Sequence, residues 1–256
     1  MDFGDSSAAV ETINTWVSDN TNARITEILN PSSVNASTAL ILTNAIWFQG
    51  DWGQAFDPEM TTARPFTRAD GSTVEVSMMA QRATVKWAEL SQGSALALPY
   101  EGGELEMLII LPDEPDGLPA LEATLNASEV MLWQQSLRSQ KVNIRLPSFE
   151  MADDMSLSGA LTALGMPSVF SASADLSGIA PSIFPSEVLH KAWVSVDEQG
   201  TEAAAATAVI TSRSAPPKIP MFNADHPFIF LIRDARSGSV LFAGRMTGEQ
   251  SAAGGG

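Results

Sequence analysis

Residues 194–210 read Val-Ser-Val-Asp-Glu-Gln-Gly-Thr-Glu-Ala-Ala-Ala-Ala-Thr-Ala-Val-Ile, and this stretch decides how the chain is interpreted. Its beginning predicts a β-strand, because Ala192, Val194 and Val196 occupy every second position, as in a pleated sheet. After Gly200 the pattern changes to a run of small and polar residues without proline. Alanine has the highest helix propensity, so composition alone favours an exposed Ala-rich helix here.

The flanking sequence favours a loop instead of a helix. A helix of this size needs an apolar face with which to pack, and residues 200–208 contain no large apolar side chain. Downstream, Pro216, Pro217 and Pro220 exclude a helix and predict an extended, exposed segment. A loop with small alternate side chains also fits into a crowded sheet as an added strand without overpacking the core. The alternate residues are Thr201, Ala203, Ala205 and Thr207.

The loop resembles the reactive-loop hinge of the serpins, a family of serine protease inhibitors whose hinge follows the pattern Glu-x-Gly-Thr-Glu-Ala-Ala-Ala-Ala-Thr. The matching residues are Glu198, Gly200, Thr201, Glu202, Ala203, Ala204, Ala205, Ala206 and Thr207. Further segments resemble serpin segments in serpin order, and they are residues 44–52, 98–100, 107–112, 146–149, 174–178, 190–191 and 226–230. The resemblance implies an α+β fold of mixed β-sheets and helices with an exposed reactive loop.

Length and element order agree with one partial serpin domain. The chain has 256 residues, 45% of them hydrophobic, which is near the length of about 250–300 residues at which single cores stop growing. Strands in runs and helices in blocks are typical of an α+β fold. We therefore expect a domain over residues 1–248 and a disordered tail over residues 249–256. In the resemblance, the Ile-Asn-x-Trp-Val motif of residues 13–17 lies well inside the family's chain, so we expect the N-terminal part of the serpin chain to be missing.

Hydrophobic periodicity, capping residues and turn residues predict the helices and strands of the chain. Asp5 or Ser6 should cap a first helix with Ala9, Ile13, Trp16 and Val17 on its buried face. The apolar run of residues 40–48 predicts a strand buried on both faces. The remaining expectations are a hairpin at Gly71, short strands over residues 74–79, 84–88, 96–100, 105–111 and 142–149, and helices over residues 118–137 and 157–164.

Charge and composition exclude several classes of protein. Thirty acidic and fourteen basic residues give a net charge of −16, which opposes binding to nucleic acid or to an anionic membrane. The absence of cysteine excludes disulfides, thiolate metal sites and a cysteine nucleophile. We expect no cofactor and no metal. The N-terminal residues form no signal region, and only the resemblance implies that the full-length protein is extracellular or periplasmic.

The resemblance also assigns a region where the central sheet opens. It implies that Asn44 and His190 lie on the two strands that part to admit the loop and hydrogen-bond there, with Trp52 at the top of the opening. The residues alone favour His190 as a satisfied core histidine, an interpretation that is compatible with the one from the resemblance. One departure is Ser148, which stands where many serpins have a lysine that pairs with the residue matched here by Glu198. A sheet without its missing neighbours would also expose an edge, which predicts self-association.

Motifs for catalysis are missing from the sequence. The chain contains no Gly-x-Ser-x-Gly elbow, no His-Glu-x-x-His motif and no phosphate-binding glycine loop. We therefore expect no enzymatic activity, and a hydrolase is the least favoured alternative. The resemblance implies a suicide-substrate inhibitor of serine endopeptidases that traps the acyl-enzyme by inserting its loop into the central sheet. The alternative is a non-inhibitory serpin relative or an inert fragment.

The sequence leaves two positions for the primary specificity residue. Arg213 is the only basic residue between Lys191 and Lys218, and it lies in the extended segment between the hinge and the prolines. A scissile bond between Arg213 and Ser214 predicts a trypsin-like target, since such proteases recognise a long cation with an acidic pocket. Counting from Gly200 with the family's commonest spacing gives Ser214 instead, which would suit a protease with a small pocket.

Overall fold

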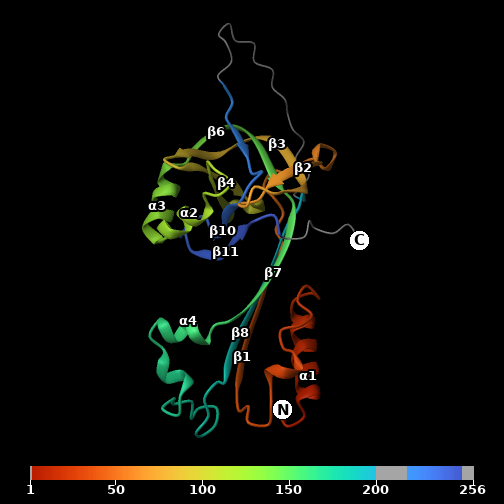
Figure 1. The fold of residues 1–256 in the computed structure, drawn as a ribbon, viewed down its shortest axis with the longest axis vertical. Helices are drawn as coiled ribbons and strands as arrows, with labels where there is room; N and C mark the ends of the chain where they lie inside the picture. The colour runs from red at the N-terminus through yellow and green to blue at the C-terminus, as the bar shows by residue number, and fades with distance from the viewer. Residues whose placement is uncertain (1, 200–217, 250–256) are drawn as a thin grey trace. The chain divides into compact units, whose positions relative to one another are not determined.

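The computed structural model describes residues 2–199 and 218–249, which form two compact units (Figure 1). The first unit comprises Met1–Phe48 and Met151–Val194, and the second comprises Gln49–Glu150 and Ser195–Gly256. The hinge from Gly200 onward, Arg213, Ser214 and most of the expected tail lie outside the described residues. The α+β fold with mixed β-sheets is confirmed.

A three-stranded sheet with the order β1-β8-β7 organises the first unit. Its strands are β1 (Ile41–Phe48), β7 (Phe149–Ser156) and β8 (Glu187–Val196). Helix α1 (Ser6–Asn20) begins as predicted at Asp5, whose carboxylate accepts a hydrogen bond of 3.1 Å from the Ala8 amide. Helix α4 (Ser158–Ala163), with 3-10 turns at Pro31–Ser33 and Pro167–Phe170, completes the unit.

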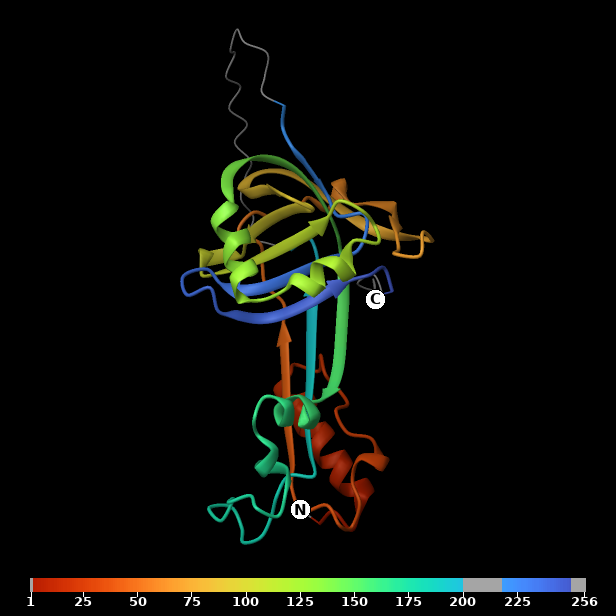
Figure 2. The same ribbon diagram turned by 60° about the vertical axis from the view of Figure 1, so that its left-hand side comes forward.

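One face of the first unit's sheet is packed. Val17 of α1 and Ile25 form a buried cluster with Trp193 of β8. A second cluster joins Val10 and Leu29 to partly buried Ile41 and Leu189. Helix α1 therefore packs on the side of the sheet that carries the odd-numbered residues of β1 and β8, and in Figures 1 and 2 the helix lies alongside these strands.

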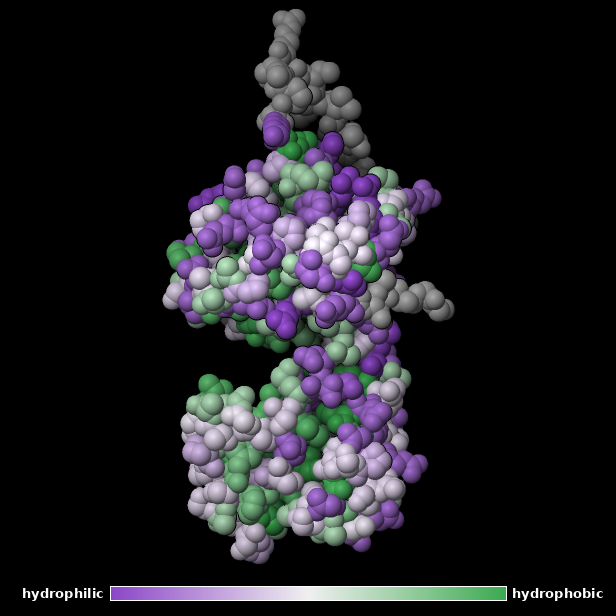
Figure 3. Space-filling view, viewed as in Figure 1, coloured by the Kyte–Doolittle hydropathy of each residue, from purple (hydrophilic) through white to green (hydrophobic). Residues whose placement is uncertain are grey.

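The other face of this sheet is open among the described residues. Leu42 and Ile46 of β1 have 42% and 37% of their surface exposed, so β1 is not buried on both faces. The expected burial of Trp16 in α1 is also wrong, because this side chain is 57% exposed and lies off the buried stripe of the helix. Hydrophobic side chains gather on the visible surface of the first unit in Figure 3. Leu164, Met166 and Ile179 are further exposed hydrophobic residues of the first unit.

The second unit is built on an eight-stranded sheet in the order β11-β10-β5-β4-β3-β6-β9, with β2 paired to β3. The strands are β2 (Thr62–Thr67), β3 (Thr73–Leu90), β4 (Gly93–Pro99), β5 (Leu105–Pro112), β6 (Arg138–Pro147), β9 (Met221–Asn223), β10 (Phe228–Asp234) and β11 (Val240–Met246). Strand β3 is one continuous strand of 18 residues, where the sequence predicted two short ones. It is bordered by β2, β4 and β6 because its length allows it to pair with different strands along its two edges.

Two helices cover part of one face of this larger sheet (Figure 2). They are α2 (Leu118–Thr124) and α3 (Ala127–Ser136), where the sequence predicted a single helix over residues 118–137. The break lies at Asn126, whose side-chain oxygen caps α3 by accepting from the amides of Ser128 and Glu129. Leu118 and Trp133 are buried as predicted, but Leu125 and Leu132 are exposed, which corrects two of the expected core residues.

Candidate functional site

Strands β1 and β8 are direct neighbours and form a closed parallel pair. Their register runs without interruption from Ile41 opposite Glu187 to Phe48 opposite Val194, through eight residue pairs. A strand inserted here would have to separate all eight pairs. The position at which the sequence expects the sheet to open is therefore closed in this structure.

Asn44 and His190 are opposite each other in this register, and their side chains are in contact. The Nδ1 atom of His190 lies 2.8 Å from Oδ1 of Asn44. An amide oxygen only accepts hydrogen bonds, so the imidazole donates from Nδ1. Both side chains lie on the open face of the sheet, opposite to the face that α1 covers. The structure thus brings together the two residues that the sequence predicted to meet.

Trp52 is the third residue predicted at the opening, and it lies in the second unit with only 2% of its surface exposed. Its ring stacks on Tyr100, with centroids 4.6 Å apart and an angle of 9° between the rings. Phe56 contacts it edge-on at 6.1 Å. Its Nε1 donates to the carbonyl of Asp197 at 2.8 Å. Trp52 therefore holds the chain that directly follows β8 through its hydrogen bond to Asp197.

Residues 49–61 hold the three residues between the end of β8 and Gly200, which are Asp197–Gln199. The amide of Trp52 donates to the carbonyl of Gln199 at 3.0 Å, and the amide of Phe56 donates to the carbonyl of Glu198 at 3.1 Å. The Gln49 side chain contacts the Asp197 carboxylate at 3.3 Å. We call Asp197–Gln199 the hinge root. The segment that follows Gln199 therefore starts from residues held by hydrogen bonds.

Glu198 has a partner that the sequence did not predict. The hydroxyl of Thr61 donates to its carboxylate at 2.7 Å. Ser148, which stands at the position matched to the family's lysine, is buried and donates instead to the carbonyl of Ser77 at 3.3 Å. Thr61 follows the 3-10 turn Pro58–Met60, and nothing in its local pattern marks it as a partner of a residue 137 positions away. A neutral hydroxyl contact thus holds the carboxylate in this chain.

Tyr100 stacks on Trp52, and the pKa of its buried phenol is shifted. Burial raises the pKa of its phenol well above the usual value, and the negative charge of Asp197 raises it further. Both causes disfavour the phenolate. Tyr100 therefore stays neutral throughout the physiological range and acts as a packing partner of Trp52.

The second histidine, His226, has both ring nitrogens occupied. Nε2 lies 2.7 Å from the carbonyl oxygen of Pro112, and Nδ1 lies 2.9 Å from the carboxylate of Asp225. A general base in a hydrolase needs one free nitrogen directed at the nucleophile. The arrangement of His226 therefore suits a structural role that ties β10 to the end of β5.

Within residues 2–199 and 218–249, no group of three or more His, Asp or Glu side chains has the arrangement of a metal site. Over the same residues, no helix is both long and apolar enough to cross a membrane.

Comparisons with known proteins agree with this geometry. A family model described as Serpin (serine protease inhibitor) matches residues 1–248. Human neuroserpin is 37% identical over 96% of this chain, and the leukocyte elastase inhibitor of Xenopus laevis is 42% identical over 91%. The structure of uncleaved ovalbumin superimposes with a TM-score of 0.86 at 35% identity over 96% of this chain and 64% of its own. Native protease nexin-1 with heparin gives a TM-score of 0.85 at 32% identity, over 96% of this chain and 67% of its own.

The chain spans 62% of the length of human neuroserpin and 64% of the length of the Xenopus protein. The three-stranded sheet and the larger sheet are both contained in the matched region, since the match reaches from residue 1 to residue 248.

Proposed function

The chain belongs to the serpin family, and from this premise we propose that it is part of a suicide-substrate inhibitor of serine endopeptidases. In the proposed reaction the serine hydroxyl of the target attacks a peptide bond of the loop. The bond breaks, the residues before it remain esterified to the protease, and the new amino terminus departs with the C-terminal part of the chain. The inhibitor does not turn over, because the loop rearranges before water hydrolyses the ester.

The closed β1–β8 pair, which the hinge follows in the sequence, carries this proposal. The hinge follows β8 directly through the fixed root Asp197–Gln199, and residues 200–210 are long enough to run beside the eight residue pairs of β1 and β8. A segment that turns back from the root would run antiparallel to both strands. Separation of the pair opens one row of backbone groups on each strand, and the inserted segment pairs with both rows.

Insertion gains a second ladder of backbone hydrogen bonds. The closed sheet has one ladder between β1 and β8, and insertion replaces it with two ladders of similar length. A net backbone hydrogen bond is worth ~0.5–1.5 kcal/mol, so a gained ladder of about eight bonds contributes roughly 8 kcal/mol. The segment enters without steric conflict because residues 203–206 are all alanine.

We place the scissile bond between Arg213 and Ser214, which gives the protein a trypsin-like target. Arg213 is the single cation between the hinge and Pro216, and a trypsin-like pocket recognises a cation. Ser214 as the primary residue is the alternative, and it would direct the protein to a protease with a small pocket. Replacement of Arg213 by Ala separates them: slower inhibition of trypsin-like enzymes supports Arg213, whereas an unchanged rate with faster trapping of an elastase-like enzyme supports Ser214.

Incubation with trypsin followed by a denaturing gel tests the proposed function. We expect a high-mass complex that survives denaturation, together with a released C-terminal fragment that begins at Ser214. Thr201→Arg and Ala203→Pro are the diagnostic variants, since a large side chain or a missing N–H obstructs insertion without affecting the folded sheets. Each should be cleaved without trapping the protease. Ala208→Ser, a small replacement in the same loop, serves as the control and should behave like the parent.

Two other outcomes would contradict the proposal. Loop cleavage without any complex in the parent chain would identify a non-inhibitory serpin relative or an inert fragment. Turnover of an ester substrate would identify a hydrolase. If the variants trapped protease as efficiently as the parent, insertion of the hinge would be excluded as the trapping step.

We further propose that this chain self-associates and that the full-length protein acts outside the cytoplasm, in an extracellular or periplasmic compartment. Self-association is supported by the position of β1 at the end of the sheet order β1-β8-β7, which leaves one of its edges without a strand among the described residues. Light scattering should detect a species larger than a monomer. A monodisperse monomer with a cooperative melt at high temperature would contradict this part of the proposal.

A further inference from the structure

Four basic residues lie on the outer face of two paired strands in the second unit. They are Arg82 and Lys86 of β3 and Lys141 and Arg145 of β6, and we call them the basic strip. The residues between them on each strand, such as Val85, Val142 and Ile144, are buried in the opposite direction. Alternation along the strands therefore places all four cations on one side of the sheet.

The register of β3 and β6 arranges these cations in a regular row. Arg145 is opposite Ala80, Arg82 is opposite Asn143, Lys141 is opposite Thr84, and Lys86 is opposite Ser139. Each successive cation is thus two residues further along the pair and on the other strand. Two residues of an antiparallel strand span about 6.8 Å and neighbouring strands are about 4.8 Å apart, so the row is a zigzag roughly 20 Å long.

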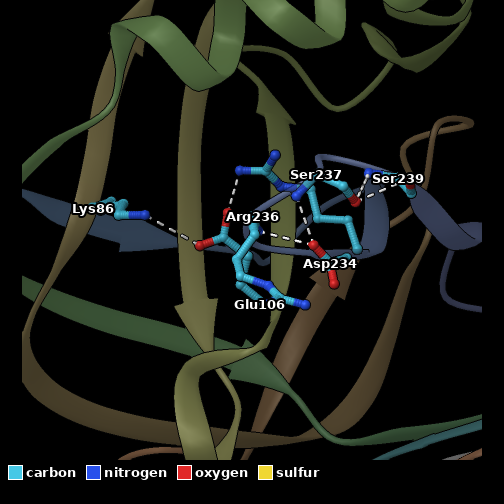
Figure 4. A network of polar contacts seen from close by, with 7 residues as sticks. Lys86, Glu106, Asp234, Arg236, Ser237 and Ser239 are labelled. Atoms are coloured by element: carbon cyan, nitrogen blue, oxygen red, sulfur yellow. Dashed lines mark hydrogen bonds and ion pairs between the residues drawn. The ribbon is translucent and has the colours of Figure 1, made fainter.

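The basic strip has little internal compensation for its charge. Thr84, Ser139 and Asn143 separate the cations, and none of them is acidic. Lys86 lies 3.4 Å from Glu106, but Glu106 also pairs with buried Arg233, so its charge is shared (Figure 4). Within the described part of the chain, Arg82, Lys141 and Arg145 form no ion pair, although Arg82 donates to the Asn143 side chain at 2.8 Å. This local excess of positive charge contrasts with the net charge of −16.

One end of the basic strip opens into a groove. The groove has a volume of about 1,210 Å³, and Arg82, Asn143 and Arg145 line one side of it. Its lining includes the exposed apolar side chains of Met60 and Met221. Asp57 and Glu198 contribute carboxylates to the same groove, and Glu198 is engaged by Thr61. A ligand on the strip therefore meets cations along its length and an apolar space at the Arg145 end.

We propose that the basic strip binds an extended acidic peptide segment of a partner protein. Alternate side chains of an extended peptide repeat every 6.6–6.8 Å or so, which equals the axial spacing of the four cations. Carboxylates at every second position would each meet one cation, and a large apolar residue at one end fits the groove. Single-stranded nucleic acid fits less well, because neither the strip nor its intervening residues offer an aromatic ring for base stacking.

Fluorescence anisotropy with two labelled peptides tests this proposal at low ionic strength. One peptide has Glu at every second position, Ser between them and Leu at one end. The other has the same composition with all Glu residues in one block. We expect the alternating peptide to bind about fivefold more tightly than the block peptide, and added salt to weaken its binding, because exposed charge pairs are individually weak and screened.

Matched double variants locate the site. Lys141→Gln with Arg145→Gln removes half of the basic strip and should weaken binding of the alternating peptide about fivefold. Arg64→Gln with Arg236→Gln removes the same charge from exposed positions off the strip and should change the affinity less than twofold. Near-equal loss in both variants, or equal binding of the two peptides, would overturn the proposal. A sulfated polysaccharide or an oligonucleotide that binds through the strip, with no preference between the peptides, would overturn it as well.

Discussion

The two sheets of this protein are packed to very different degrees. In β5, seven of the eight residues are buried, and the neighbouring β10 is buried over six of its seven residues. In β1, by contrast, every residue is exposed or only partly buried. Stability varies locally with the number of buried apolar contacts, so the larger sheet forms a rigid platform and the β1–β8 pair is the part that separates with least cost. The proposed function requires separation at this same pair.

The largest effect that distinguishes the two sheets should come from truncating one isoleucine in each. Ile109 of β5 is fully buried, whereas Ile46 of β1 is 37% exposed. Ile109→Ala should lower the free energy of unfolding by about 2–5 kcal/mol through lost burial and a cavity. Ile46→Ala should lower it by less than about 1 kcal/mol, since part of its surface is already in water. Urea unfolding measures both, and equal losses would contradict the comparison.

High pH should destabilise the platform through Tyr100. The pKa of its phenol is raised in the folded protein, so the folded state holds the proton more tightly than the unfolded state. This contribution is fully present below the unfolded pKa of about 10 and is lost as pH rises above it. The chain contains a single tyrosine, so the near-ultraviolet absorbance of phenolate reports Tyr100 alone.

We expect phenolate to appear only together with unfolding. Tyr100→Phe provides the control, because its free energy of unfolding should lack this component of the decrease above pH 10 or so. Ionisation of Tyr100 at its ordinary pKa in a protein that remains folded would show that the packing around Trp52 is looser than described.

The smallest effect concerns the hinge root, which joins the platform to the loop. Thr61→Val keeps the shape of the side chain and removes its hydrogen bond to Glu198. We expect a loss of ~0.5–1.5 kcal/mol in the free energy of unfolding and faster amide exchange at Gln199. Thr62→Val replaces an exposed neighbour and should change neither quantity. Unchanged exchange in the Thr61 variant would show that the hydrogen bond from Thr61 to Glu198 does not stabilise the hinge root.

Sequence patterns predicted well wherever local and tertiary preferences agree. Asp5 as the cap of α1, the turn at Gly71 and the pairing of Asn44 with His190 are all confirmed. The failures have physical causes. A single helix over residues 118–137 was wrong because Asn126 is a stronger cap than a helix interior residue. The burial of β1 was overestimated because an apolar run does not reveal whether both faces have partners.

The contacts of the site were less predictable than its location. The pairing of Glu198 with Thr61 crosses 137 positions and depends on a turn that places the hydroxyl. The register of β3 and β6, which produces the basic strip, is likewise set by tertiary pairing. Arg82, Lys86, Lys141 and Arg145 alternate with buried residues in the sequence, so their common face on each strand could have been inferred, but not their order across the two strands.

The central claim is that the hinge inserts between β1 and β8, and thermal unfolding before and after loop cleavage tests it most directly. The protein is nicked in the loop with a trace of protease and separated from any complex. An added ladder of roughly 8 kcal/mol predicts a rise in the melting temperature on the order of 15–30 °C. Nicked Thr201→Arg should show no such rise. An unchanged or lower melting temperature in the nicked parent would contradict insertion.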